Sequence, residues 1–103
     1  MSVLADMFLR GPVRWGWLAD AGQTPGRGLH VAIALLVQAG IERQPTVRMR
    51  RRFVRSMGVD RHAEARALHA LEQAGLIAVS RGVGRRPVVT LVNHLPIPTR
   101  SVV

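Results

Sequence analysis

The feature that most constrains the fold is a helical segment with a capping residue, one apolar side and one basic side. Two short β-branched segments follow it directly, and all three lie within residues 58–92. The helical segment reads GVDRHAEARALHALEQAGLI, and Asp60 is placed to accept hydrogen bonds from free backbone N–H groups of the first turn. Gly75 suits the end of the helix. The apolar residues spaced as its buried face are Ala63, Ala67, Leu68 and Leu71. We therefore expect a helix over residues 61–74 that packs one face against a core.

The other side of this helix is basic and includes one small residue. Its members are Arg61, His62, Ala65, Arg66 and His69. A helix that only filled a core would not need a basic side, whereas a helix laid in a phosphate-lined groove would use one. Ala65 is small at a point where close approach to a partner would be useful. The sequence therefore predicts that this side faces an anionic partner.

Two β-branched segments, Leu76–Ser80 and Val88–Val92, follow the helix and predict a β-hairpin. The segment between them is basic and contains glycines that permit a close turn. The residues of this tip that we single out are Arg81, Gly82, Gly84, Arg85 and Arg86. Their arginines would enter a minor groove, grip phosphates, or remain solvated without a partner.

Upstream, the segment Leu29–Ala39 is apolar at helical spacing, and Gly40 is placed to stop the helix. The predicted buried face consists of Leu29, Ile33, Leu36 and Val37. Because further residues make the helix apolar on most of its circumference, it is either the central core helix or one that also faces a second subunit. Residues 46–49 alternate as a short strand with outward arginines, and residues 51–57 predict a short helix.

The expected fold is α+β, with a three-helix core, a short strand and a C-terminal β-hairpin over residues 29–93. A chain of 103 residues has room for one domain of this size. Residues 1–28 contain many glycines and prolines and predict an N-terminal extension with short helical pieces near residues 4–9 and 15–21. Residues 94–103 predict a tail that lies along the surface or remains disordered.

The charge of the chain indicates an anionic partner. Fifteen basic residues against six acidic ones leave a formal net charge of +9, and all fifteen are arginines. Arginine favours planar, two-pronged contact with phosphate or guanine, although the codon usage of a GC-rich genome would produce the same bias. The densest run, RMRRRFVR at residues 48–55, is either a phosphate-contacting surface or a solvated face without a partner.

Several function classes are disfavoured by the composition. The chain has no cysteine, and its four histidines are too dispersed to form a convincing zinc set, so we expect no metal and no cofactor. The sequence holds no catalytic spacing, paired carboxylates or phosphate-cradling glycine loop that would indicate an enzyme. The N-terminus lacks the order of a secretory signal, and the longest uncharged apolar-rich run is too short to span a bilayer. We therefore expect a non-enzymatic, cytoplasmic, nucleoid-associated protein that does not enter the membrane.

The segment 58–77 resembles the winged helix-turn-helix of GntR-type bacterial repressors, and in architecture the resemblance covers residues 43–92. That family's pattern is Gly-Val-Ser-Arg, two variable residues, Ala-Leu, a leucine three residues later, and Gly-Leu-Ile or Gly-Leu-Val. The residues in step with it are Gly58, Val59, Arg61, Ala67, Leu68, Leu71, Glu72, Gly75, Leu76 and Ile77. Asp60 replaces the usual serine, and Ala63 and Glu64 replace a Thr-Val pair. No effector-binding domain follows, so the resemblance does not imply the ligand control typical of full GntR regulators.

The resemblance implies that helix 61–74 is a recognition helix lying in the major groove of DNA. The residues it places at the bases are Arg61, His62, Ala65, Arg66 and His69, among which the arginines best suit guanine. Those it places on the DNA backbone, where contacts position the protein without reading sequence, are Arg48, Arg50, Arg51, Arg52 and Arg55. Glu64 would either accept from a cytosine amino group or pair with Arg61 along the helix.

A repressor of this size would bind as a homodimer, because one recognition helix reads too few base pairs to stand out in a genome. The residues assigned to the dimer contact are Trp15, Trp17, Leu29 and Leu36. The two tryptophans would alternatively form a lid on the core. The segment WGWL at residues 15–18 is also similar to one that precedes the first helix in small winged-helix proteins of proteobacteria and their mobile elements.

The function implied is sequence-specific binding of double-stranded DNA by a small transcriptional repressor of a bacterium or a mobile element. One alternative is a winged-helix module that binds an acidic surface of a nucleic-acid-processing protein. Another is a plasmid or phage replication accessory protein. RNA binding is disfavoured because the chain offers few aromatic side chains on which bases would stack.

Overall fold

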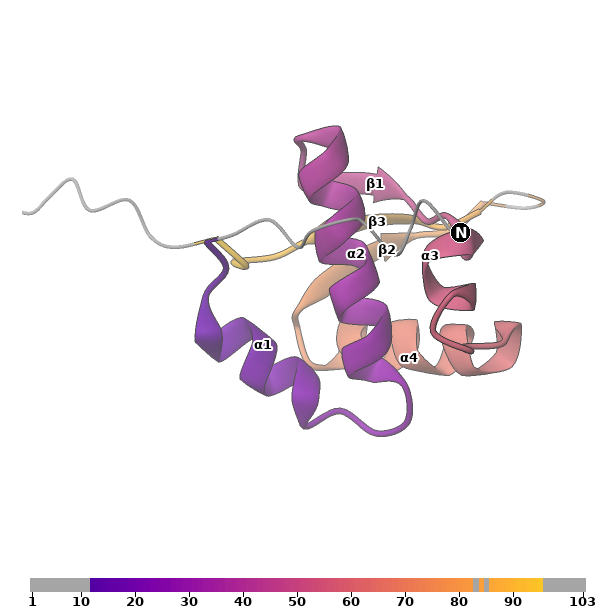
Figure 1. Ribbon diagram of the computed structural model, residues 1–103, viewed down its shortest axis with the longest axis horizontal. Helices are drawn as coiled ribbons and strands as arrows, with labels where there is room; N and C mark the ends of the chain where they lie inside the picture. The colour runs from indigo at the N-terminus through magenta and orange to yellow at the C-terminus, as the bar shows by residue number, and fades with distance from the viewer. Residues whose placement is uncertain (1–11, 83, 85, 96–103) are drawn as a thin grey trace, which may run out of the picture.

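Four helices and three strands make up the part of the chain that the computed structural model describes, which is residues 12–82, 84 and 86–95 (Figure 1). In chain order they are α1 (Trp15–Gly22), α2 (Gly28–Glu42), β1 (Thr46–Arg48), α3 (Arg51–Arg55), α4 (Arg61–Gln73), β2 (Ile77–Ser80) and β3 (Val88–Leu91). The predicted α+β class is confirmed, as is the order of helix, strand, helix, helix and hairpin. The helical piece expected near residues 4–9 and the tail from residue 96 lie outside the described residues.

Helix α2 is the central core helix, which was one of the two predicted alternatives. It contacts α1, α3, α4 and β1, and in Figure 1 it crosses the sheet. Its predicted buried face is wrong in part, since Leu29 is 37% exposed and Ile33 and Val37 are only half-buried. The fully buried side is centred instead on Val31 and Leu35, both 0% exposed. A helix that is apolar on most sides carries no signal for which side its neighbours will cover.

The helix does not stop at Gly40, contrary to the prediction. It runs to Glu42 and ends at Arg43, which has a left-handed φ of 56°. Gln38 Nε2 donates to Glu42 Oε2 at 2.9 Å across this last turn. A glycine inside a helix costs only about 1 kcal/mol relative to alanine, so tertiary contacts easily override it as a stop signal.

The three strands form an antiparallel sheet in the order β1-β3-β2. The predicted hairpin is confirmed, with Ile77 paired to Leu91 in the register of β2 and β3. β1 pairs with the other edge of β3. The alternation predicted for β1 is also present, because Val47 and Met49 are 2% and 1% exposed while Arg48 between them faces solvent.

Helix α1 belongs to the same core, although its residues fall in the predicted N-terminal extension. Trp17 is 1% exposed, and its indole Nε1–H donates to the carbonyl of Leu76 at 3.1 Å. His94 is also buried, and its ring meets the Trp17 ring edge-on with centroids 6.3 Å apart. The Arg14 N–H donates to the His94 carbonyl at 2.8 Å. The core therefore extends N-terminal to residue 29, and the first residue of the predicted tail is packed rather than trailing.

Candidate nucleic-acid interface

Helices α3 and α4 are joined by residues 56–60, which form a tight turn. The N–H groups of Gly58 and Val59 donate to carbonyls of the last turn of α3 at 3.0 and 3.1 Å. Gly58 has a φ of 76°, in the left-handed region that glycine adopts at no steric cost. Val59 is 1% exposed and anchors the turn in the core. The turn thereby fixes the start of α4 relative to α3.

Asp60 caps α4, as predicted. Its Oδ1 accepts from the N–H of Ala63 at 2.8 Å. This hydrogen bond lowers the pKa of Asp60 below its ordinary value, and the nearby charges of His62 and Arg66 act in the same direction. The carboxylate is therefore ionised at neutral pH and satisfies a backbone donor that helix geometry leaves free.

Gly75 ends α4, also as predicted. It has a φ of 77°, and its N–H donates to the Glu72 carbonyl at 3.0 Å. The N–H of Leu76 donates to the Leu71 carbonyl at 3.1 Å. These two bonds make a Schellman motif, which turns the chain sharply from α4 into β2.

The predicted basic side of α4 is exposed, and its predicted apolar side is buried. The exposed residues are Arg61, His62, Ala65, Arg66 and His69. The buried residues are Ala63, Glu64, Ala67, Leu68 and Leu71. In Figure 1 the β2–β3 hairpin extends toward the side of the molecule where α3 and the start of α4 lie. We call the five exposed residues the basic face of α4; contact between this face and DNA remains a prediction.

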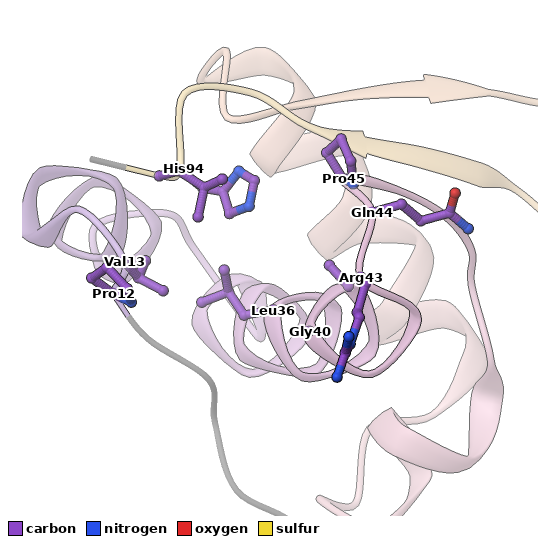
Figure 2. Close-up of a pocket in the computed structure, with 10 residues that line it drawn as sticks. Pro12, Val13, Leu36, Gly40, Arg43, Gln44, Pro45 and His94 are labelled. Atoms are coloured by element: carbon purple, nitrogen blue, oxygen red, sulfur yellow. The ribbon is translucent and has the colours of Figure 1, made fainter. Parts of the chain in front are cut away.

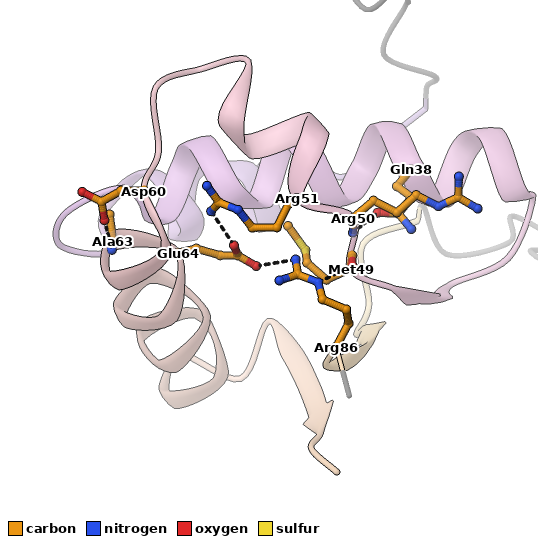
Figure 3. A network of polar contacts seen from close by, with 8 residues as sticks. All are labelled: Gln38, Met49, Arg50, Arg51, Asp60, Ala63, Glu64 and Arg86. Atoms are coloured by element: carbon orange, nitrogen blue, oxygen red, sulfur yellow. Dashed lines mark hydrogen bonds and ion pairs between the residues drawn. The ribbon is translucent and has the colours of Figure 1, made fainter. Parts of the chain in front are cut away.

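Glu64 is the one ionisable member of the buried set, with a side chain that is 5% exposed. Its Oε1 accepts from Nη1 of Arg51 at 2.8 Å, and its Oε2 accepts from Nη2 of Arg86 at 3.1 Å (Figure 3). Arg86 Nε also donates to the Met49 carbonyl at 3.1 Å. A buried carboxylate persists only when its charge is paired and hydrogen-bonded. Glu64 therefore joins α3, α4 and the base of the hairpin into one unit.

This network corrects three predictions. Glu64 does not pair with Arg61 and is too buried to meet a base edge. Arg51, predicted on the DNA backbone, turns its guanidinium to Glu64 and has a side chain that is only 18% exposed. Arg86, predicted at the hairpin tip, instead anchors the base of the hairpin, although its side chain keeps 38% exposure. The physical reason is the same in each case, because a buried carboxylate requires cationic partners.

The other arginines predicted on the DNA backbone are all exposed: Arg48, Arg50, Arg52 and Arg55. Arg50 Nε lies 3.7 Å from the Glu42 carboxylate, and both groups are in contact with solvent. The guanidinium carbon of Arg52 lies 5.3 Å from the centroid of the Phe53 ring. Exposed pairs of this kind contribute about 0–1 kcal/mol, so these arginines remain available to a polyanion.

The hairpin tip is described only in part. Arg81, Gly82 and Gly84 are exposed, whereas Arg85 lies outside the described residues. Gly84 has a φ of 70°, so a glycine suits this turn as predicted. Arg81 Nη1 lies 3.3 Å from Glu72 Oε1 in an exposed pair.

The residues predicted at a dimer contact divide into two groups. Trp17 and Leu36 are 1% and 4% exposed, so both serve the core of their own chain and not a partner surface. Trp15 and Leu29 are 78% and 37% exposed. A dimer contact through the exposed pair remains a prediction. For Trp17, the alternative use as a lid on the core is confirmed.

A separate hollow of about 260 Å³ lies at the C-terminal end of α2, between residues 12–13 and residues 94–95 (Figure 2). Leu36 contributes to an apolar part of its wall, and Arg43 and His94 are its ionisable lining residues. Burial lowers the pKa of His94 below its ordinary value. Arg43 precedes β1 at the end of the sheet away from the hairpin tip, so this hollow is separate from the basic face of α4.

Comparison with protein-family models, curated proteins and solved structures finds no match to this chain. The likeness to GntR-type repressors therefore rests on the residues of this sequence. No helix among the described residues is long and apolar enough to cross a bilayer. Within the same part of the chain, no group of three or more His, Asp or Glu side chains is arranged to hold a metal ion.

The structural roles of two residues near the basic face, Gln38 and Glu64, were not identified from the sequence. Gln38 is 1% exposed; its Nε2 donates to the Arg48 carbonyl at 2.6 Å and its Oε1 accepts from the Arg50 N–H at 3.2 Å. Gln38 thus fixes the junction that leads from β1 into α3. Glu64 carried a usable signal, because it lies three residues before Ala67 and four before Leu68 and so falls on the buried side of the helix.

Proposed function

We propose that this protein binds double-stranded DNA sequence-specifically as a winged helix-turn-helix regulator, with α4 as the recognition helix and the β2–β3 hairpin as the wing. The observation that carries the proposal is the basic face of α4. Two arginines and two histidines surround Ala65, and no carboxylate is exposed between Arg61 and His69. The major groove of B-DNA accepts an α-helix, and the net charge of +9 provides the long-range attraction to phosphate.

Base recognition is assigned first to Arg61 and Arg66, with His62 and His69 beside them. An arginine that bonds both O6 and N7 of guanine contributes about 1–3 kcal/mol of discrimination against a wrong base. Ala65 permits close approach of the helix between these side chains. Arg61 is the first residue of α4, whereas Arg66 lies more than one turn inside the helix, and it is therefore the residue whose loss tests base recognition most directly.

Affinity that does not depend on sequence is assigned to five exposed arginines of the β1–α3 segment and the hairpin. These are Arg48, Arg50, Arg52, Arg55 and Arg81. Contacts of this kind position a protein on the duplex and make binding fall with salt. Arg51 is left out of this set, because its guanidinium is bonded to Glu64 and its side chain is only 18% exposed.

The regulator is proposed to act as a homodimer on an inverted repeat in the nucleoid of a bacterium, or on a mobile element, and to repress transcription. Trp15 and Leu29 are the exposed members of the predicted dimer contact. An acidic surface on a protein partner would attract the same arginines, so the experiment must separate a reader of DNA sequence from a general polyanion binder.

Selection from random double-stranded DNA near physiological salt makes this separation. Wild type, Arg66→Ala and the control Arg43→Asn would be selected in parallel. Arg43→Asn removes the same charge away from the basic face, and asparagine tolerates the left-handed φ of 56° at that position. We expect wild type and the control to enrich one inverted repeat, and Arg66→Ala to lose preference at one or more positions. Failure of wild type to enrich any sequence contradicts the proposal and favours a protein partner.

A further inference from the structure

The hollow between α4 and the base of the hairpin is lined by arginines from three separate places in the chain. It has a volume of about 280 Å³. Arg61 comes from the start of α4, Arg81 follows β2, and Arg86 precedes β3. Ala65 and Leu68 contribute apolar lining. The hollow therefore lies where the two elements proposed to contact DNA come together.

The charges that line this hollow are not balanced. The lining includes three arginines and only one carboxylate, that of Glu64, so positive charge is in excess. The same carboxylate is also bonded to Arg51, so part of its charge is already neutralised from outside the hollow. Arg81 has an additional exposed partner in Glu72, at 3.3 Å. An anion is the class of ligand that this lining favours.

Arg86 is held in one orientation before any ligand arrives. Its Nε donates to the Met49 carbonyl and its Nη2 to Glu64, both at 3.1 Å. A guanidinium has five N–H donors, and these two bonds use two of them. The side chain is still 38% exposed, and it is one of the residues that line the hollow. A side chain that is already fixed loses little conformational entropy when it binds.

We infer that this hollow binds one backbone phosphate of the DNA, with Arg86 as its fixed ligand and Arg81 closing on it from the hairpin, while Arg61 keeps the base contact proposed above. The inference rests on the proposed function and deepens it by naming where one strand passes. A tetrahedral phosphate offers acceptor oxygens that suit the planar fork of arginine. The apolar Ala65 and Leu68 offer no competing hydrogen bonds.

Glu64 is then a positioning residue that does not touch DNA. Its Oε2 accepts from Arg86 Nη2 and so holds that guanidinium in place at the hollow, which both residues line. The distance between the recognition helix and the wing is set by the same carboxylate, because Glu64 belongs to α4 and Arg86 to the base of the hairpin. A single phosphate site at this point would fix the register of both elements on the duplex.

The test uses the duplex enriched by wild type, rebuilt as a set in which one phosphate at a time is replaced by an uncharged methylphosphonate. Affinities of full-length wild type, Arg86→Gln and Arg43→Asn would be measured on each duplex at several salt concentrations. For wild type and the control, we expect one position in each half-site at which neutralisation weakens binding about tenfold, the equivalent of about 1.4 kcal/mol. For Arg86→Gln that position should no longer matter, and the log–log salt slope should be smaller by about 0.9 per half-site.

The variant Glu64→Gln distinguishes the loss of Arg86 orientation from the loss of the Arg86 charge. This variant keeps Arg86, so the salt slope should stay at the wild-type value while affinity falls a few-fold. Arg81→Gln provides a second variant of the hollow whose side chain is exposed and outside the buried network, so its folding is not at risk. It should also reduce the sensitivity at the same phosphate.

The outcomes distinguish the inference from the proposed function. If wild type binds the selected duplex but Arg86→Gln keeps the full sensitivity at every phosphate, the hollow is not a phosphate site, and the proposed function stands. If wild type selects no duplex, both fail, and an acidic protein surface becomes the partner to seek. Loss of one phosphate position in Arg86→Gln, and not in Arg43→Asn, supports the inference.

Discussion

Replacement of Glu64 by glutamine should destabilise the protein far more than the same change at another glutamate of α4. Glutamine keeps the size of the side chain and one acceptor oxygen but removes the charge. Arg51, whose side chain is 18% exposed, would then be a half-buried cation facing a neutral amide. Breaking a buried pair costs about 3–5 kcal/mol when one charge is left uncompensated.

The expected magnitude is smaller than that limit for two structural reasons. Arg51 is not fully buried, and the amide oxygen of glutamine still accepts one hydrogen bond. Loss of the ion pair with Arg86 contributes less to the destabilisation than loss of the pair with Arg51. The Arg86 side chain is 38% exposed and keeps its bond to the Met49 carbonyl. We therefore expect Glu64→Gln to lower the free energy of unfolding by about 2 kcal/mol, with a fall in Tm of about 8–16 °C for a domain of this size.

The assay is urea unfolding followed by tryptophan fluorescence and circular dichroism at neutral pH. Glu72→Gln is the matched control, since Glu72 lies on the same helix and its pair with Arg81 is exposed; it should change stability by no more than about 0.5 kcal/mol. A double-mutant cycle of Glu64→Gln with Arg51→Gln should give a coupling of about 1–2 kcal/mol. Equal effects of the two glutamate changes, or a coupling near zero, would refute the reasoning.

Three further predictions concern the caps and the buried histidine. Asp60→Ala should lower the free energy of unfolding, and Asp60→Asn should recover much of it, because asparagine also caps helices. Since the pKa of Asp60 is lowered in the folded state, the charge-dependent part of its stabilisation should be present above about pH 4 and lost as the pH falls through the lowered pKa, as measured by urea unfolding from pH 7 to pH 2. Burial lowers the pKa of His94, so stability should fall as the pH drops below its ordinary value of 6.5, and His94→Leu should flatten the curve between pH 7 and pH 5; an unchanged curve would contradict this assignment. Gly75→Ala should cost about 1 kcal/mol through its φ of 77°, whereas Gly22→Ala, at a position without positive φ or close neighbours, should cost nothing when both variants are measured by urea unfolding.

The parts of the fold that were predictable depend on signals close together in the sequence. Asp60 and Gly75 bound α4 through hydrogen bonds that reach only three to five residues along the chain, and both positions were identified correctly. The buried and exposed sides of α4 follow from helical spacing and from the contrast between leucine and arginine. The hairpin follows from two β-branched segments around a glycine-containing turn.

The parts that were missed depend on contacts between distant residues. Glu64 has partners 13 and 22 residues away, so its burial was readable from spacing while the identity of its partners was not. Arg51 was therefore assigned to the DNA backbone, and Arg86 was placed at the tip of the hairpin instead of at its base. Trp17 donates to a carbonyl 59 residues away, and no local pattern indicates that contact. The buried side of α2 could not be predicted for a different reason, because the helix is apolar on nearly all sides.

The central claim is that the basic face of α4 reads bases while the arginines around it supply affinity. The most direct measurement compares the affinities of wild type and Arg66→Ala for the selected duplex and for duplexes that differ from it by one base pair. We expect each wrong base pair to cost wild type about 1–3 kcal/mol, and Arg66→Ala to lose that discrimination at one position in each half-site. If Arg66→Ala weakens binding to every duplex by the same factor, Arg66 contacts phosphate and α4 does not read the sequence through it.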